Sequence, residues 1–315
     1  FKKISVKYNK YLRIKLFYKI KKKIIDLNII KDSLLMNLVY IFYAFIKFLI
    51  LSRFNFDAPI KMKSKKRSNT LVILGAGNTL NELNQEQLKY ISECDIAGLS
   101  YSIFYPLKQK YFFFESPTSY QIETINVLRQ KLLPRVESLY KNKDIENLIW
   151  KNPEENFFKK FLNHKNYRNM IVCNILTNNK LIMIKVIKII EYLKLNRYFL
   201  LQKRGSIFTI VQFAKLMGYT KVIFSGIDLL NNKYFVEDEL YKKYGLPNPS
   251  TIDIASRIST YGKNLSSSIH NTEDSNLDLP ISKALSYLFE EYSDIKFLVT
   301  SKNTELLKYT QLWKI

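Results

Sequence analysis

The residue best suited to acid–base chemistry in this 315-residue chain is His270, one of two histidines. It lies late in residues 231–279, a polar stretch that is rich in Ser, Asn and Tyr and has little apolar periodicity. A loop of this length is usually functional, for example as a lid, and an imidazole can deprotonate a hydroxyl near neutral pH. The chemistry of His270 therefore suits a general base, and the alternative is an exposed loop histidine without a catalytic role. The other histidine, His164, lies in a polar run and is interpreted as a surface residue.

A second group of reactive side chains follows a strand predicted at residues 222–224. The apolar run continues into Ser225-Gly226-Ile227-Asp228. In open α/β sheets, ligands bind outside the carboxyl ends of the strands. Gly226 and Asp228 are therefore candidate contacts to a nucleotide or a sugar. The alternative is that the acid only caps a turn.

Two cations and a hydroxyl precede the helix predicted over residues 206–217. Lys203 and Arg204 come just before this helix, and Ser206 opens it. A helix N-terminus with adjacent cations attracts a carboxylate or a phosphate. These three residues are therefore candidate substrate-binding groups. The alternative is a serine cap beside solvated cations.

A glycine-containing turn, with Gly75, Gly77 and Thr79, follows the strand predicted at residues 70–74. Glycines at this position let the backbone approach a phosphate or a ribose closely. The third glycine of a dinucleotide fingerprint is absent, and no acid ends the next strand, so the pattern gives little support to NAD binding. Further candidate substrate contacts, at the ends of the next two strands, are Ser100 and Ser116. The alternative for both is a polar turn at a strand end.

Together these segments resemble bacterial sialyltransferases of glycosyltransferase family 42. The resemblance is clearest over residues 203–234, continues at 270–288 and is weak at 75–80. It implies a CMP-activated acidic sugar as the donor and His270 as the general base. It also implies that Tyr234 donates a hydrogen bond to the departing phosphate.

Two departures from the family pattern concern the donor site. Ala76 stands where the family has an Asn that contacts the nucleotide, and Leu230 stands where a second phosphate-binding tyrosine would be. The strand ends also lack an Asp-X-Asp motif, with which many nucleotide-sugar transferases hold a metal ion. The resemblance therefore implies an inverting, metal-independent transfer that needs no cofactor besides the CMP-sugar donor.

Beyond residue 66, strands alternate with helices, which predicts an α/β fold with a single Rossmann-like, doubly wound, mostly parallel sheet of a GT-A-like variant. The predicted strands are residues 70–74, 95–100, 111–114, 170–176, 222–224 and 295–300. The predicted helices are residues 83–91, 120–133, 180–193, 206–217, 280–292 and 304–312. Residues 134–169 show no clear pattern.

Residues 1–66 differ from the rest and are predicted to be a membrane-associating helical region before a catalytic domain at 67–315. Residues 2–31 are rich in Lys, with apolar residues at helical spacing, which is typical of a basic amphipathic helix. Residues 34–51 are almost wholly apolar. Basic residues flank both of their ends, which favours a helix in the membrane plane over a spanning one. The remaining alternative is a helical hairpin packed on the core.

The formal net charge of +23 indicates a polyanionic partner, which could be nucleic acid, an anionic membrane or an acidic sugar. The alternative is a compositional bias toward Lys, Ile and Asn from an AT-rich genome. The basic residues cluster in residues 1–67 rather than across the α/β body, which argues against nucleic acid. Cys94 and Cys173 lie in apolar runs without the spacing of a disulfide framework or a zinc site. We expect both to be buried, reduced thiols.

These observations predict a bacterial glycosyltransferase at the cytoplasmic face of the inner membrane. It would move a nonulosonic acid, such as sialic, legionaminic or pseudaminic acid, or a Kdo-type sugar, from its CMP form to a hydroxyl of a capsular or lipooligosaccharide glycan. The expected partners are the nucleotide-sugar donor, a lipid-linked glycan acceptor and an anionic membrane surface; homo-oligomerisation stays open. One alternative is a flagellin-type protein glycosyltransferase with a related Rossmann domain. The other is a non-catalytic protein that binds membranes or nucleic acid.

Overall fold

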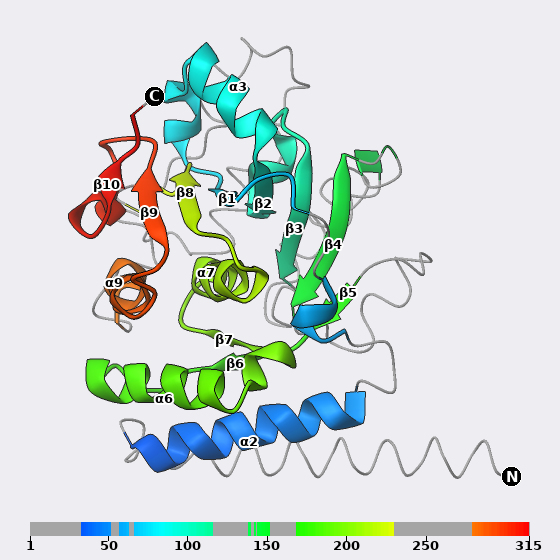
Figure 1. The fold of residues 1–315 in the computed structure, drawn as a ribbon, viewed down its shortest axis with the longest axis vertical. Coiled ribbons are helices and arrows are strands. Elements are labelled where there is room, and N and C mark those ends of the chain that lie inside the picture. Colours follow the sequence, from blue (N-terminus) through cyan, green and yellow to red (C-terminus); the bar gives the residue numbers. More distant parts are fainter. Residues whose placement is uncertain are drawn as a thin grey trace, which may run out of the picture.

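A computed structural model describes residues 33–51, 57–62, 66–115, 138–139, 142, 144–151, 168–229 and 279–314. Its main sheet has eight strands in the order β10-β9-β8-β1-β2-β3-β4-β5, and all neighbouring strands pair in parallel (Figure 1). The strands are β1 (Thr70–Leu74), β2 (Asp95–Leu99), β3 (Gln109–Glu115), β4 (Ile145–Lys151), β5 (Arg168–Met170), β8 (Lys221–Ser225), β9 (Lys296–Val299) and β10 (Gln311–Leu312). The predicted α/β class with a parallel sheet is confirmed.

The strand order reverses between β1 and β8. From β1 the chain adds β2 to β5 on one side, and it later returns to place β8, β9 and β10 on the other side. The last residues of the two central strands, Leu74 and Ser225, are register partners. In open α/β sheets, the carboxyl ends of the strands at such a reversal are where ligands bind.

Apolar side chains of the central strands alternate between two cores, as the two-residue period of a strand requires. Leu71 and Ile73 belong to a core with α7 (Ser206–Met217) and α9 (Ile281–Glu291). Val72 and Leu74 belong to a second core on the side of α3 (Gln85–Glu93). The sheet is therefore covered on both faces, which explains why its central strands are continuous apolar runs.

An outer layer covers the α7 and α9 side. It contains α6 (Lys180–Tyr192), α2 (Leu34–Leu51) and a two-stranded parallel sheet of β6 (Val172–Asn174) and β7 (Leu200–Gln202). The helix α6 packs against α9, and α2 packs against α6 and β6. Among the labelled elements, α2 lies at the outside of this layer (Figure 1).

One face of α2 is part of the protein core. Ile41, Ala44 and Phe48 are buried in the same apolar cluster as α7. The buried Asn37 accepts a hydrogen bond at Oδ1 from the Leu176 N–H at 3.0 Å. This packing agrees with the alternative of a helix packed on the core, whereas the predicted domain boundary at residue 66 stays a prediction. Within the described residues, no helix has the length and apolar character needed to cross a membrane.

Both cysteines have buried, free thiols, as predicted. Burial raises the pKa of the Cys173 thiol to about 12. Because the thiolate is the reactive form, these cysteines are structural.

The structure corrects two predicted elements and adds two. The single strand predicted at residues 170–176 is divided between β5 in the main sheet and β6 in the small sheet. The helix predicted at 304–312 is a 3₁₀ turn, Glu305–Lys308, followed by β10, since pairing with β9 outweighs local helix propensity there. The strands β4 and β7 were not predicted. The predicted helix 120–133 and the predicted lid 231–279, except Leu279, lie outside the described residues.

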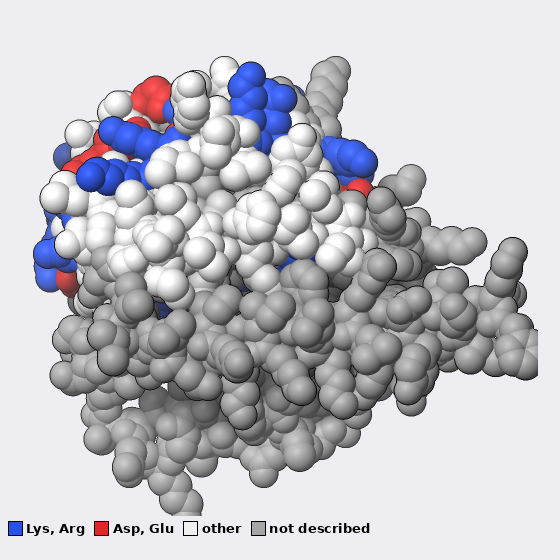
Figure 2. All heavy atoms as spheres, turned by 90° about the horizontal axis from the view of Figure 1, so that it is seen from below, with Lys and Arg blue, Asp and Glu red and all other residues white. Residues whose placement is uncertain are grey.

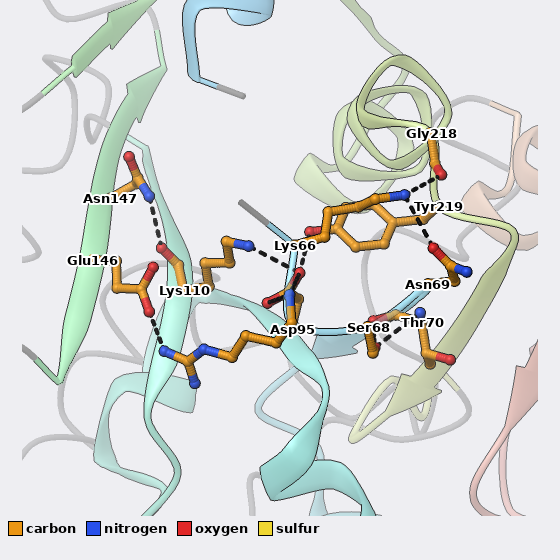
Figure 3. Close-up of polar contacts among 11 residues, drawn as sticks. Lys66, Ser68, Asn69, Thr70, Asp95, Lys110, Glu146, Asn147, Gly218 and Tyr219 are labelled. Atoms are coloured by element: carbon orange, nitrogen blue, oxygen red, sulfur yellow. Dashed lines mark hydrogen bonds and ion pairs between the residues drawn. The ribbon is translucent and has the colours of Figure 1, made fainter. Parts of the chain in front are cut away.

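The amino edge of the main sheet holds a buried ion pair (Figure 3). Asp95, the first residue of β2, accepts hydrogen bonds from Lys110 Nζ at 2.9 Å and from Tyr219 Oη at 2.8 Å. The backbone N–H of Arg67 also donates to this carboxylate. The side chains of Asp95 and Lys110 are fully buried, and each charge neutralises the other. This cluster joins β2, β3 and the end of α7, so its role is architectural.

Candidate active site

Two turns pack directly on each other at the carboxyl ends of β1 and β8. The Gly75 N–H donates to the Ser225 carbonyl, and the Gly77 N–H donates to the Gly226 carbonyl, both at 2.8 Å. A Cβ on Gly75 would clash with the Gly226 carbonyl, and a Cβ on Gly77 would clash with the carboxylate of Asp228. Gly226 also has a φ of 67°, which glycine adopts without strain. The three glycines are therefore required for these two turns to meet.

The carboxylate of Asp228 is buried at this junction. Its Oδ2 accepts a hydrogen bond from the Thr79 N–H at 3.2 Å, and its Oδ1 accepts one from the Thr79 hydroxyl. Burial raises the pKa of Asp228 to about 6; the charge of Glu82 adds to this rise, and the hydrogen bonds from Thr79 oppose it. Asp228 thus titrates close to neutral pH, beside the glycine turn predicted to contact a ligand.

A cationic group lies at the same edge of the sheet, at the end of β4. Lys151 is 1% exposed, and its Nζ donates to Ser206 Oγ at 2.6 Å and to Gln202 Oε1 at 3.1 Å. Since α7 leads into the parallel strand β8, the helix runs back across the sheet and its first residue, Ser206, lies at the carboxyl edge. The ammonium of Lys151 is therefore held at the N-terminus of α7, where both charges attract an anion.

A second lysine is buried in the turn before α7. Lys203 is 3% exposed, and its Nζ donates to Asn178 Oδ1 at 2.8 Å. The turn is tight, because the Gly205 N–H donates to the Lys203 carbonyl and Arg204 between them has a φ of 58°. The turn directs Lys203 into the protein and leaves Arg204 partly exposed.

The structure places the predicted site residues in two groups. One group lies at the junction of β1 and β8: Gly75, Gly77, Thr79, Gly226 and Asp228. The other lies at the start of α7: Lys203, Arg204 and Ser206. Ser100 follows β2 and opens a 3₁₀ turn at the same edge of the sheet. The other predicted residues lie outside the described residues: Ser116, Tyr234 and His270.

Lys151, Gln202 and Asn178 were not predicted as site residues. Lys151 directly follows the apolar run Leu148-Ile149-Trp150 and is the last residue of β4, and a lysine at the end of such a run is the signal that would have identified it. That signal was missed because β4 itself was not recognised. In the described part of the chain, no group of three or more His, Cys, Asp or Glu could hold a metal ion. Metal independence stays a prediction.

Comparisons with known proteins identify no family for the chain. No family model matches it, and no curated protein matches it by sequence. Among solved structures, it is similar to the monofunctional α-2,3-sialyltransferase Cst-I from Campylobacter jejuni, with 16% identity, 79% of this chain and 82% of that chain covered, and a TM-score of 0.44. An α-2,3-sialyltransferase from Campylobacter jejuni in apo form has 17% identity, coverage of 80% and 83%, and a TM-score of 0.41. The sialyltransferase CstII from Campylobacter jejuni in complex with cytidine-5'-monophosphate has 19% identity, coverage of 77% and 84%, and a TM-score of 0.37.

Proposed function

We propose that the chain is a glycosyltransferase that uses a CMP-activated acidic sugar, a nonulosonic acid or a Kdo-type sugar, as its donor. The observation that carries this proposal is the buried ammonium of Lys151 on Ser206, at the same edge of the sheet as the buried carboxylate of Asp228. The strands β1 and β4 are three positions apart, which corresponds to about 14 Å at the usual strand spacing. An acidic sugar linked to a nucleotide presents hydroxyls and an acid at two such separated places.

The nucleotide would bind at the junction of β1 and β8. The ionised form of Asp228 can accept hydrogen bonds from ribose hydroxyls, and Thr79 can share the same carboxylate. Gly75 and Gly77 allow the two turns to pack together and so hold the Asp228 carboxylate at this junction. This assignment follows the general location of ligands at a strand-order reversal.

The acid of the sugar would bind at the start of α7. A hydrogen bond from the Lys151 ammonium polarises the Ser206 hydroxyl and makes it a better donor to a carboxylate. The N-terminus of α7 adds partial positive charge at the same place. Lys203 and Arg204 lie on the adjoining turn, where they would stabilise the phosphate or the acid of the donor.

The proposed reaction follows the family resemblance of the sequence. His270 removes the proton from an acceptor hydroxyl, whose oxygen attacks the anomeric carbon in line. The bond from that carbon to the phosphate oxygen breaks, CMP departs, and the configuration inverts. Tyr234 donates a hydrogen bond to the departing phosphate. CMP leaves as a monophosphate, so less charge develops than on a departing diphosphate, and we propose that no metal is needed.

We propose that the acceptor is a capsular or lipooligosaccharide glycan at the cytoplasmic face of the inner membrane. The support is the basic composition of residues 1–66, since each Lys or Arg near an anionic leaflet adds about 1 kcal/mol of attraction. A lipid-linked acceptor would be presented at that surface.

The test is release of CMP from CMP-activated acidic sugars in the presence of EDTA. A His270→Ala variant should lose about two to four orders of magnitude in turnover, the usual contribution of a general base, and should bind CMP as before. His164→Ala is the matched control and should be nearly silent. Turnover that requires a divalent metal, or that proceeds normally without His270, would contradict the mechanism.

A further inference from the structure

Exposed large apolar side chains gather on one layer of the molecule. Among the described residues, nine such side chains are exposed, and eight of them belong to α2, to α6 or to the segment between α6 and β7. These eight are Leu35, Val39, Phe42, Leu49, Leu181, Tyr192, Leu193 and Tyr198. The ninth, Tyr309, lies near the C-terminus. Such a concentration of exposed apolar side chains in one layer is typical of a surface that contacts a membrane or another protein.

The helix α2 is apolar on both faces. Its inner face packs into the core, whereas Leu35 and Phe42 on its outer face are 70% and 66% exposed. From the side on which α2 lies, the molecule shows a continuous area of uncharged side chains, with Lys and Arg at its margin and a few carboxylates (Figure 2). Leaving large apolar side chains in water forgoes their favourable transfer to an apolar medium, so this face has the character of a contact surface.

The exposed charges on α6 and on the segment that follows it are basic, and one of them, Lys188, pairs with Glu291 of α9 at 3.3 Å. The exposed charged residues of α6 and of the segment that follows it are Lys185, Lys188, Lys194 and Arg197. The acid of this stretch, Glu191, is only partly exposed and hydrogen-bonds Tyr292; burial raises its pKa.

Apolar side chains surrounded by Lys and Arg are the composition of a helix that lies in a membrane interface. Tyrosines such as Tyr192 and Tyr198 are also enriched at the membrane–water boundary. A protein partner would need complementary carboxylates around an apolar centre, whereas an anionic bilayer supplies both features over the whole layer.

We propose that the layer formed by α2, α6 and the segment 193–198 is a membrane-binding surface that lies flat on an anionic bilayer. The membrane contact is then a face of the folded body and extends beyond residues 1–66. The hydrogen bond from Leu176 to Asn37 and the packing of Phe48 hold α2 on the protein, so this helix stays parallel to the surface. The inference rests on the proposed function only for the location of the acceptor, and its test does not require activity.

The test is flotation of the full chain with vesicles of phosphatidylcholine, with and without phosphatidylglycerol. Replacing both Tyr192 and Leu193 by Ser should weaken binding to the anionic vesicles by about tenfold or more, because two apolar side chains no longer enter the interface. This variant retains all of residues 1–66, so a loss would come from the end of α6 and the residue that follows it. Leu35→Ser combined with Phe42→Ser should have a similar effect, and Tyr309→Ser is the matched control.

Unchanged vesicle binding by the Tyr192 and Leu193 variant, with its fold verified by circular dichroism, would overturn the inference. Failure of the wild-type chain to float with anionic vesicles would also overturn it. Analytical ultracentrifugation distinguishes the remaining case: a wild-type dimer that both double variants dissociate would make this face an interface between copies of the chain. None of these outcomes depends on CMP release, which tests the proposed function separately.

Discussion

The two edges of the main sheet hold buried charges in different ways. At the amino edge, the Asp95 carboxylate contacts the Lys110 ammonium directly, and Tyr219 completes the cluster. At the carboxyl edge, Asp228 accepts hydrogen bonds from Thr79, and the contacts of Lys151 include hydrogen bonds to Gln202 and Ser206. The first arrangement neutralises charge within the protein. The second holds an acid and an ammonium at separate places at the edge where ligands bind.

This difference separates residues that stabilise the fold from residues expected to bind substrate. Breaking a closed, buried pair leaves a single buried charge, which is strongly destabilising. At the carboxyl edge, the Lys151 ammonium and the Asp228 carboxylate lie at separate places, so a ligand that carries an acid and hydroxyls could contact both. Substitutions at the amino edge should therefore change stability, whereas substitutions at the carboxyl edge should change ligand binding in addition to any effect on stability.

The largest effect on stability is expected for Lys110→Met. It leaves the Asp95 carboxylate buried without its cationic partner, with Tyr219 and the Arg67 N–H as its other donors among the described residues, so the free energy of unfolding should fall by about 3–5 kcal/mol. Urea unfolding measures this loss. Lys151→Met is the matched substitution at the other edge and should cost less, because Gln202 and Ser206, which accept hydrogen bonds from Lys151, are neutral and leave no buried carboxylate behind. An equal loss of stability for both variants would contradict the proposed difference between the amino edge and the carboxyl edge of the sheet.

Asp228 should make a pH-dependent contribution to the free energy of unfolding, smaller than the loss expected for Lys110→Met. Its folded pKa of about 6 lies above its ordinary value of 3.8, so the folded state binds the extra proton. The contribution to stability is full below about pH 4 and is lost as pH rises through 6, a change of about 3 kcal/mol. Urea unfolding at pH 4 and pH 7 should show this loss in the wild type and its absence in Asp228→Asn. A wild type that gains stability from this group over the same range would contradict the raised pKa.

The smallest effect is expected for Arg67→Ala, which removes an ion pair to Glu146. The two side chains are 40% and 37% exposed, and exposed pairs contribute less than about 1 kcal/mol. The unfolding midpoint in urea should hardly move, and the small difference should shrink further in high salt. A loss comparable to that of Lys110→Met would show that exposed and buried charges at this edge are not separable.

Much of the fold follows from local sequence patterns. The strands β1, β2, β8 and β9 are short apolar runs between turn residues, and α2, α7 and α9 carry apolar helical repeats, so all were predictable. The strand β4 was not, because Glu146, Asn147 and Lys151 interrupt its apolar character. The end of the chain was predicted as a helix because its pairing with β9 is a tertiary contact that local propensity does not contain.

The site was predictable where it depends on strand ends. The apolar strand runs before them predicted that three residues lie at the carboxyl edge: Gly77, Thr79 and Asp228. The helical pattern that begins at Ser206 placed this residue at the start of a helix. The contact between Lys151 and Ser206 joins residues 55 positions apart, and no local pattern records such a pairing. The role of α2 was ambiguous for the same reason, since its sequence is apolar all round and does not state which face the protein covers.

The central claim is that the carboxyl edge binds a CMP-activated acidic sugar, and calorimetry in EDTA tests it most directly. CMP should bind the wild type, and a non-transferable CMP-linked acidic sugar should bind more tightly. Lys151→Met should change the affinity for CMP by less than about threefold. It should lower the affinity for the CMP-linked acidic sugar by about tenfold or more, the size of a lost charge-assisted hydrogen bond. CMP binding only when Mn²⁺ is supplied, preference for UDP or NAD over CMP, or equal weakening of both ligands by Lys151→Met would contradict the claim.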